Sequence, residues 1–170
     1  MLKKTFLLLL LLVLSASPID AAIETTKPTA ANGAMIISKF EGHEPITLDT
    51  FNYVYFVKKF YPADAQYYIH LAIDAHKNFW YFQDNAIEIK VDGETLAINN
   101  TATNKNNFYG ALRRSESTSK INSKIVEKIA GADKVSIKAF FFNKPTIHWE
   151  DPTDILQEWK SIIKSSGKSE

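Results

Sequence analysis

The sequence contains no cysteine, and this absence excludes several kinds of chemistry. A chain without thiols has no cysteine nucleophile, no thiolate ligand for a metal and no disulfide. Small extracellular domains often depend on disulfides, so the hydrophobic core alone must hold these 170 residues together. That length is enough for one domain with a substantial core and is short for two.

Hydrophobic runs long enough to span a membrane are also missing. The apolar run Phe6–Leu14 has nine residues, whereas a membrane-spanning helix needs about 20. Two lysines precede this run and small residues follow it, which is the layout of a secretory signal peptide. We predict that residues 1–21 are a signal peptide cleaved near Ala21 or Ala22, and that no transmembrane anchor remains after cleavage.

Neither sign of charge dominates the chain. Removal of the signal takes away Lys3, Lys4 and Asp20, so the 20 basic and 19 acidic residues fall to 18 of each. Tight nucleic-acid binding usually needs a basic face, so we expect no nucleic-acid partner. The lysine-led signal and the lack of cysteine together indicate a bacterial protein that is exported to the periplasm or the extracellular space.

Several familiar catalytic motifs are absent from the sequence, which has no GxSxG elbow, no HExxH and no P-loop. We therefore predict no cofactor. Three residues of types that can act as metal ligands lie close together in the sequence, namely His70, Asp74 and His76. An extended chain would separate His70 from His76 by about 20 Å, too far for one ion. Asp74 and His76 remain weak metal-ligand candidates that would need a further ligand from a neighbouring strand.

Aromatic residues, in contrast, are plentiful, with eleven Phe, seven Tyr and three Trp. Flat rings pack well on a pleated surface, so this composition favours strands. Alternating patterns predict strands at Met35–Phe40, Phe51–Phe60, Tyr67–Ala75, Phe79–Gln83, Phe108–Arg114, Lys134–Asn143 and Thr146–Glu150. A helix is the open alternative for Phe51–Phe60, because its apolar residues also share one helical face.

The strongest local pattern is a hairpin within Ala86–Ile98. Asp92 and Gly93 tolerate the positive φ angles of a two-residue type I′ turn, and alternating runs flank them. This loop length predicts that Ile89 faces Leu96 on the buried side of the sheet.

Two helices complete the predicted fold. Isoleucines that recur every fourth residue indicate a helix at about 120–130, with Ser117 or Ser119 as its cap. A second helix is expected at about 152–165, with Asp151 as its N-cap. Because alternating βαβ units are absent, we predict an α+β fold with a curved, mainly antiparallel sheet and both helices packed on one face.

The predicted organisation is simple. Residues 22–34 are small and polar and are expected to form a flexible leader before a single domain at 35–165. Residues 99–107 are expected to form a polar loop, and residues 166–170 a disordered tail.

One candidate binding surface is aromatic. The segment around Phe140 and Phe142 is apolar on both faces of its predicted strand. A central strand that is covered on both sides would explain this pattern. The alternative is a partly exposed surface, shared with Trp80 or Tyr68, that binds a peptide, a glycan or a lipid.

A second candidate surface is basic. Arg113 and Arg114 precede the first predicted helix, whose N-terminal N–H groups could hold an anion. The other interpretation is a serine-rich cap with both arginines on a sheet edge.

These patterns predict a non-enzymatic exported domain that binds or scaffolds an unknown protein, glycan or lipid partner in the cell envelope. One alternative is a small secreted hydrolase or metal-dependent enzyme with a site assembled from His70, Asp74, His76 or His148. Another is a ligand carrier with a cavity between the sheet and the helices.

Overall fold

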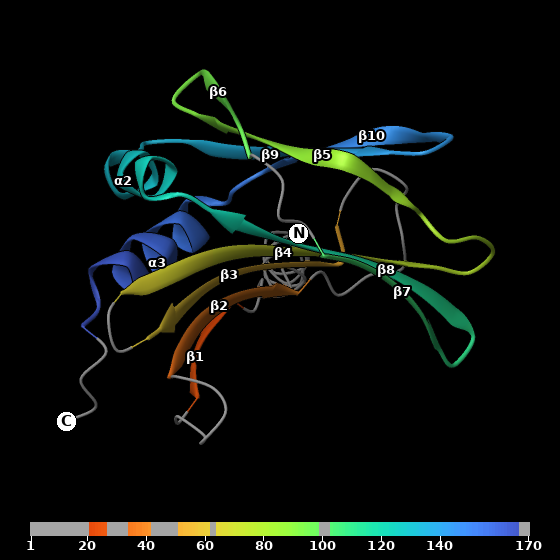
Figure 1. The fold of residues 1–170 in the computed structure, drawn as a ribbon, viewed down its shortest axis with the longest axis horizontal. Helices are drawn as coiled ribbons and strands as arrows, with labels where there is room; N and C mark the ends of the chain where they lie inside the picture. The colour runs from red at the N-terminus through yellow and green to blue at the C-terminus, as the bar shows by residue number, and fades with distance from the viewer. Residues whose placement is uncertain (1–20, 27–33, 42–50, 62–63, 99–102, 167–170) are drawn as a thin grey trace, which may run out of the picture.

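A computed structural model describes residues 21–26, 34–41, 51–61, 64–98 and 103–166. They form two antiparallel sheets that face each other and two helices at one end of the molecule (Figure 1). The predicted α+β class is therefore confirmed. The strands lie in two separate sheets, whereas the sequence patterns indicated one.

The larger sheet has six strands in the order β1-β2-β3-β4-β8-β7. Their bounds are β1 Ala21–Thr26, β2 Met35–Glu41, β3 Tyr53–Phe60, β4 Ala65–Ala75, β7 Thr103–Tyr109 and β8 Leu112–Ile121. The open question about Phe51–Phe60 is settled in favour of a strand, because β3 pairs along its whole length with β4.

The smaller sheet has four strands in the order β10-β9-β5-β6. Their bounds are β5 Phe82–Val91, β6 Glu94–Ala97, β9 Val135–Phe141 and β10 Lys144–Glu150. The predicted hairpin is confirmed: Ile89 pairs with Leu96, and the turn residues Asp92 and Gly93 have φ angles of 46° and 91°. The predicted strand Phe79–Gln83 is only partly right, because residues 79–81 connect the two sheets and β5 begins at Phe82.

One core lies between the sheets and the helix α3 (Thr153–Lys164). Trp159 of α3 stacks on Phe56 of β3 with ring centroids 4.8 Å apart, and it stacks on Trp149 of β10 at 6.0 Å. Phe40 of β2 also contacts Trp149 at 5.8 Å. These rings join both sheets to α3, as the apolar stripe of this helix predicted.

A buried lysine fixes the C-terminal end of α3. Lys58 of β3 donates hydrogen bonds to the carbonyl oxygens of Ile162, Ile163 and Ser165 at 3.2, 2.9 and 2.7 Å. The last carbonyls of a helix lack partners within the helix and carry partial negative charge, so an ammonium group satisfies them well. Burial lowers the pKa of the Lys58 side chain.

The predicted cap of the first helix is wrong. Helix α2 (Ser123–Gly131) begins after Asn122, whose side-chain oxygen accepts a hydrogen bond from the N–H of Ile125 at 3.0 Å. Ser117 and Ser119 lie in β8 instead and point into the core. A hydroxyl buried in a strand is too far from the helix to cap it.

The predicted cap of the second helix is also wrong. Pro152 occupies the N-cap position of α3, and no side chain caps this end. Both carboxyl oxygens of Asp151 are buried without a hydrogen-bond partner among the described residues. Burial, together with the nearby Glu158 carboxylate, raises the pKa of Asp151 to about 8.

Two segments that were expected to be irregular contain strands. Ala21–Thr26, within and just before the predicted leader, is β1 and pairs with β2, where Glu24 also contacts Lys39 at 2.6 Å. Thr103–Tyr109, largely within the predicted polar loop, is β7 and pairs with β8. In both cases an adjacent strand offers free hydrogen-bonding groups to a chain without apolar alternation. Residues 27–33 of the leader and residues 167–170 of the tail lie outside the described residues.

No helix within the described ranges is long and apolar enough to cross a membrane.

Candidate functional site

Large aromatic side chains are exposed at the end of the molecule opposite the helices. Phe108 is 71% exposed, Tyr109 62%, Phe142 54% and Tyr81 50%. They come from three connections, namely the β7–β8 hairpin, the chain between β4 and β5, and the β9–β10 turn. All three connections lie at the right-hand end of Figure 1. We call this surface the aromatic end and define it by Phe79, Tyr81, Phe108, Tyr109 and Phe142.

The three connections contact one another. The ring of Phe79 lies 5.2 Å from that of Phe108 in an edge-on arrangement and 5.8 Å from that of Tyr81. The backbone N–H of Phe142 donates to the carbonyl of Tyr81 at 2.9 Å. Edge-on ring contacts of this kind stabilise an arrangement beyond the area they bury. The three connections therefore lie side by side at this end of the molecule, although Phe108 and Tyr109, as neighbours in β7, point to opposite faces of their sheet.

Trp80 lies beneath this surface. It is 3% exposed, and its ring meets the buried Phe141 edge-on at 5.2 Å. The backbone N–H of Trp80 donates to the hydroxyl of Ser115 in β8 at 2.9 Å. Trp80 therefore supports the exposed rings, whereas one of the two interpretations of the sequence included it in an exposed surface.

Arg114 forms the base of the β7–β8 hairpin. Its guanidinium donates two hydrogen bonds of 2.7 Å to Asp74 of β4, which raise the pKa of Arg114. The same guanidinium lies 4.4 Å from the ring centres of Tyr53 and Tyr109. A two-bond pair between buried partners has a defined geometry. Arg114 therefore locks the hairpin to β4.

Arg113 connects two parts of the aromatic end. It donates to the carbonyl of His76 at 2.7 Å and lies 5.5 Å from the ring centre of Phe108. The predicted anion site beside a helix N-terminus is wrong for both arginines, because β8 continues from them to Ile121 and α2 begins only at Ser123.

The metal-ligand candidates are not gathered into a site. Both oxygens of Asp74 bind Arg114, and His76 lies exposed in the next connection. His70 stacks on Tyr55 at 5.4 Å, and burial lowers the pKa of this imidazole. His148 belongs to β10 in the other sheet. Within the described ranges, no group of three potential metal ligands comes together.

The two remaining aromatic candidates lie on the outer faces of the sheets. Tyr68 of β4 donates to Gln66 at 2.8 Å and lies under Lys59 at 4.9 Å. Phe140 of β9 lies under Lys138 at 5.0 Å. Phe142 is thus the one predicted aromatic residue with a largely exposed ring at the aromatic end.

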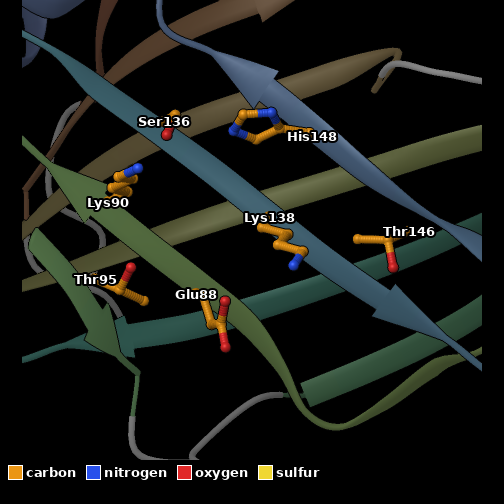
Figure 2. Close-up of a pocket in the computed structure, with 7 residues that line it drawn as sticks. All are labelled: Glu88, Lys90, Thr95, Ser136, Lys138, Thr146 and His148. Carbon is orange, nitrogen blue, oxygen red and sulfur yellow. The ribbon is translucent and has the colours of Figure 1, made fainter. Parts of the chain in front are cut away.

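A second candidate is a polar depression of about 400 Å³ on the outer face of the smaller sheet. Figure 2 shows its lining residues Glu88, Lys90, Thr95, Ser136, Lys138, Thr146 and His148. Lys138 lies directly between Glu88 and His148 in the strand register, so the depression mixes both signs of charge. Polar and charged side chains are expected on a surface in contact with water, so the depression needs no binding partner to explain it. A cluster of exposed aromatic rings is not expected there without such a partner.

Sequence reasoning missed most of the aromatic end. Phe79 and Tyr81 were assigned to a strand but lie in the β4–β5 connection, whereas Phe108 and Tyr109 do lie in a strand, at the end of β7 beside its turn. Gly110, with a φ angle of 60°, marks the hairpin turn beside Phe108 and Tyr109. The position of aromatic residues next to turn residues was the feature of the sequence that could have indicated these exposed rings.

Comparisons with protein-family models, curated proteins and solved structures find no match for this chain.

Proposed function

We propose that this chain is an exported, non-enzymatic binding domain that engages a partner of the cell envelope through the aromatic end. The observation that supports this proposal is the exposure of four large rings, from three adjoining connections, at one end of the molecule. Burying apolar area contributes about 25 cal/mol per Å², so rings left in water forgo stabilisation of the fold. Exposed apolar side chains that gather at one place on a protein are typical of interaction sites.

The support beneath the rings also favours binding. The Asp74–Arg114 pair and the Trp80–Phe141 contact hold the hairpin and the β4–β5 connection in place. A partner that meets preorganised rings loses little conformational entropy on binding. Aromatic residues and arginine are also the residue types that dominate binding energy at protein interfaces.

Crosslinking tests the proposal directly. A photoreactive amino acid replaces Tyr81 or Phe108 in cells that export the chain, and it replaces Tyr61 as a control. Tyr61 is also exposed, at 42%, but it follows β3 at a distance from the aromatic end. We expect adducts with envelope components at the two aromatic-end positions and not at residue 61. Equal labelling at all three positions, or none, would contradict the proposal.

Export has its own test. The layout of residues 1–21 supports secretion, with cleavage near Ala21 or Ala22. We expect fractionation of expressing bacteria to place the chain outside the cytoplasm, and mass spectrometry to find a new N-terminus at this point. An uncleaved chain in the cytoplasm would contradict export without bearing on the binding surface.

A further inference from the structure

We propose that the partner of the aromatic end is an anionic membrane surface, with the rings entering the headgroup region and the neighbouring cations meeting lipid phosphates. This inference rests on the proposed binding function and names the chemistry of its partner. Three features of the described residues carry it: the shape of the surface, the chemistry of its rings and the charges around them.

The shape fits a flat and deformable partner. The rings stand on connections that project from one end of the long axis of the molecule (Figure 1). The β7–β8 hairpin carries the two most exposed rings, Phe108 and Tyr109, beside its turn at Gly110. A glycan or a peptide is usually held in a hollow. Three connections that project from the same end can all insert into the headgroup region of a deformable lipid surface.

The ring chemistry fits the boundary between headgroups and hydrocarbon. Phe79, Phe108 and Phe142 carry no polar atom, so they gain most from leaving water. Tyr81 and Tyr109 each combine an apolar ring with a hydroxyl. Tyrosine is enriched at membrane interfaces because one end of its side chain can be buried while the other stays hydrated.

The charges at this end are mainly positive. Arg114 is neutralised by Asp74, and Lys105 lies across from Glu116 in the strand register. Three further cations lie in or next to the three connections, namely Lys77, Arg113 and Lys144, and the exposed acid Asp84 lies near the start of β5. None of these three cations forms an ion pair with another described residue.

The positions of two of these cations link charge to the rings. Arg113 lies 5.5 Å from the ring centre of the exposed Phe108, while Lys144 lies 5.6 Å from that of Trp80, which is buried beneath the exposed rings. A cation beside a ring that enters the headgroup region comes within reach of lipid phosphates. Each lysine or arginine near an anionic leaflet adds to the attraction, which salt screens.

Vesicle flotation tests the inference. The chain purified after export is mixed with vesicles of phosphatidylglycerol and phosphatidylethanolamine, or with vesicles of phosphatidylcholine alone. We expect binding to the anionic vesicles, and about a tenfold loss of affinity for Phe108→Ser or Phe142→Ser, the scale of one ring transfer. Arg113→Gln with Lys144→Gln is expected to weaken binding severalfold and to reduce its salt dependence.

Matched controls keep the result interpretable. Tyr61→Ser removes a ring that is also exposed, at 42%, but lies away from the aromatic end, so vesicle binding is expected to be unchanged. Thermal unfolding of each variant shows whether it is folded. If Phe108→Ser fails to fold, Arg113→Gln with Lys144→Gln serves alone, because these changes alter exposed or half-buried groups.

The outcomes separate this inference from the proposed function. Binding that is lost in the aromatic-end variants and kept in Tyr61→Ser supports it. Binding that ignores those variants overturns it, as does a failure to bind anionic vesicles. If vesicles are not bound but Tyr81 still crosslinks to a protein or a glycan, the inference fails and the binding function stands. If neither occurs, both fail.

Discussion

The two ends of the molecule use the same residue types in opposite ways. At the helical end, which carries α2 and α3, the rings of Phe56, Trp149 and Trp159 stack on one another inside the core. At the aromatic end, Phe79 and Phe108 also contact each other, but on the surface. Ring contacts close a core in the first case and build an exposed patch in the second. Aromatic content therefore serves folding at one end and, as we propose, binding at the other.

The charged groups differ between the ends as well. The helical end buries Lys58 against helix carbonyls and Asp151 without a described partner. The aromatic end buries one complete ion pair, Asp74–Arg114, and leaves its other cations accessible. If this contrast is right, substitutions in the buried parts of either end should destabilise the fold, whereas substitutions of the exposed rings should not.

The largest expected effect is at the helical end. Trp159→Ala removes a fully buried ring that joins α3 to both sheets. We expect the free energy of unfolding in urea to fall by about 3–5 kcal/mol because a large cavity is left. Trp159→Phe keeps a ring in contact with Phe56 and should cost clearly less. A loss below about 1 kcal/mol for alanine would show that this ring is not central to the core.

The next largest effect on stability is expected from the buried ion pair that lies beneath the exposed rings of the aromatic end. Asp74→Ala leaves the largely buried guanidinium of Arg114 without its two hydrogen bonds. We expect a loss of about 3 kcal/mol in unfolding free energy, because an uncompensated buried charge is costly. Asp84→Ala, at an exposed carboxylate in β5, is the matched control and should change little. Equal losses of unfolding free energy for Asp74→Ala and Asp84→Ala would show that the Asp74–Arg114 pair has no special role in stability.

The pH dependence of stability should reveal the buried acid of the helical end. The pKa of Asp151 is about 8 in the folded chain, against about 4 when unfolded. Between these values the folded state keeps a proton that the unfolded state releases, so stability falls as pH rises. We expect a loss of about 2 kcal/mol from about pH 6 to about pH 8, measured by urea unfolding.

Asp151→Asn tests the origin of that slope. The amide has nearly the same shape and does not titrate, so the variant should lose most of this pH dependence and be the more stable protein at about pH 8. Asp154→Asn changes an exposed carboxylate in the first turn of α3 and should keep the slope. If the pH dependence of the unfolding free energy is unchanged in Asp151→Asn, another titrating group must cause it.

A smaller effect is expected at the end of α3. Lys58→Met keeps the length of the buried stem and removes the ammonium that binds three carbonyls. We expect a loss of about 1–2 kcal/mol, since Ser165 still donates to the carbonyl of Ile162. Lys59→Met, next in the strand on the opposite face, is the control. Hydrogen exchange should show faster opening of α3 in Lys58→Met alone.

The smallest effect on stability should come from the exposed rings. Phe108→Ala removes a side chain that is 71% exposed. We expect the unfolding free energy to change by less than about 0.5 kcal/mol, as for most surface substitutions. A loss as large as that of Trp159→Ala would mean that this ring belongs to the fold, and the comparison between the two ends would fail.

Local patterns predicted the elements whose cause is local. The Asp92–Gly93 turn fixed the register of its hairpin, because only a few residues tolerate the required φ angles. The apolar stripe of α3 marked its buried side correctly. In β8 the pattern misled, because small hydroxyl residues such as Ser117 and Ser119 fill the buried positions. A strand whose inner face is made of serine shows no apolar alternation.

The aromatic end could not be predicted as a site because it is assembled from distant segments. Tyr81, Phe108 and Phe142 meet only after the chain has passed between the two sheets. The sequence showed the rings and some of the turns beside them, but nothing in local spacing decides which turns meet. For the same reason the sequence left open whether Arg114 holds an anion or lies on the sheet, because its partner Asp74 is 40 residues away.

The hydrogen bond from Ser38 to Glu158, at 2.6 Å, joins residues that are 120 positions apart. It lies between β2 and α3, which also pack against each other. Because β2 is near the start of the chain and α3 is near its end, these contacts can form only after most of the chain has been synthesised. Contacts of such long range are associated with slow folding. If the chain is exported, as we propose, slow folding would leave it unfolded for longer before it crosses a membrane, because its core includes α3, the last element of the fold.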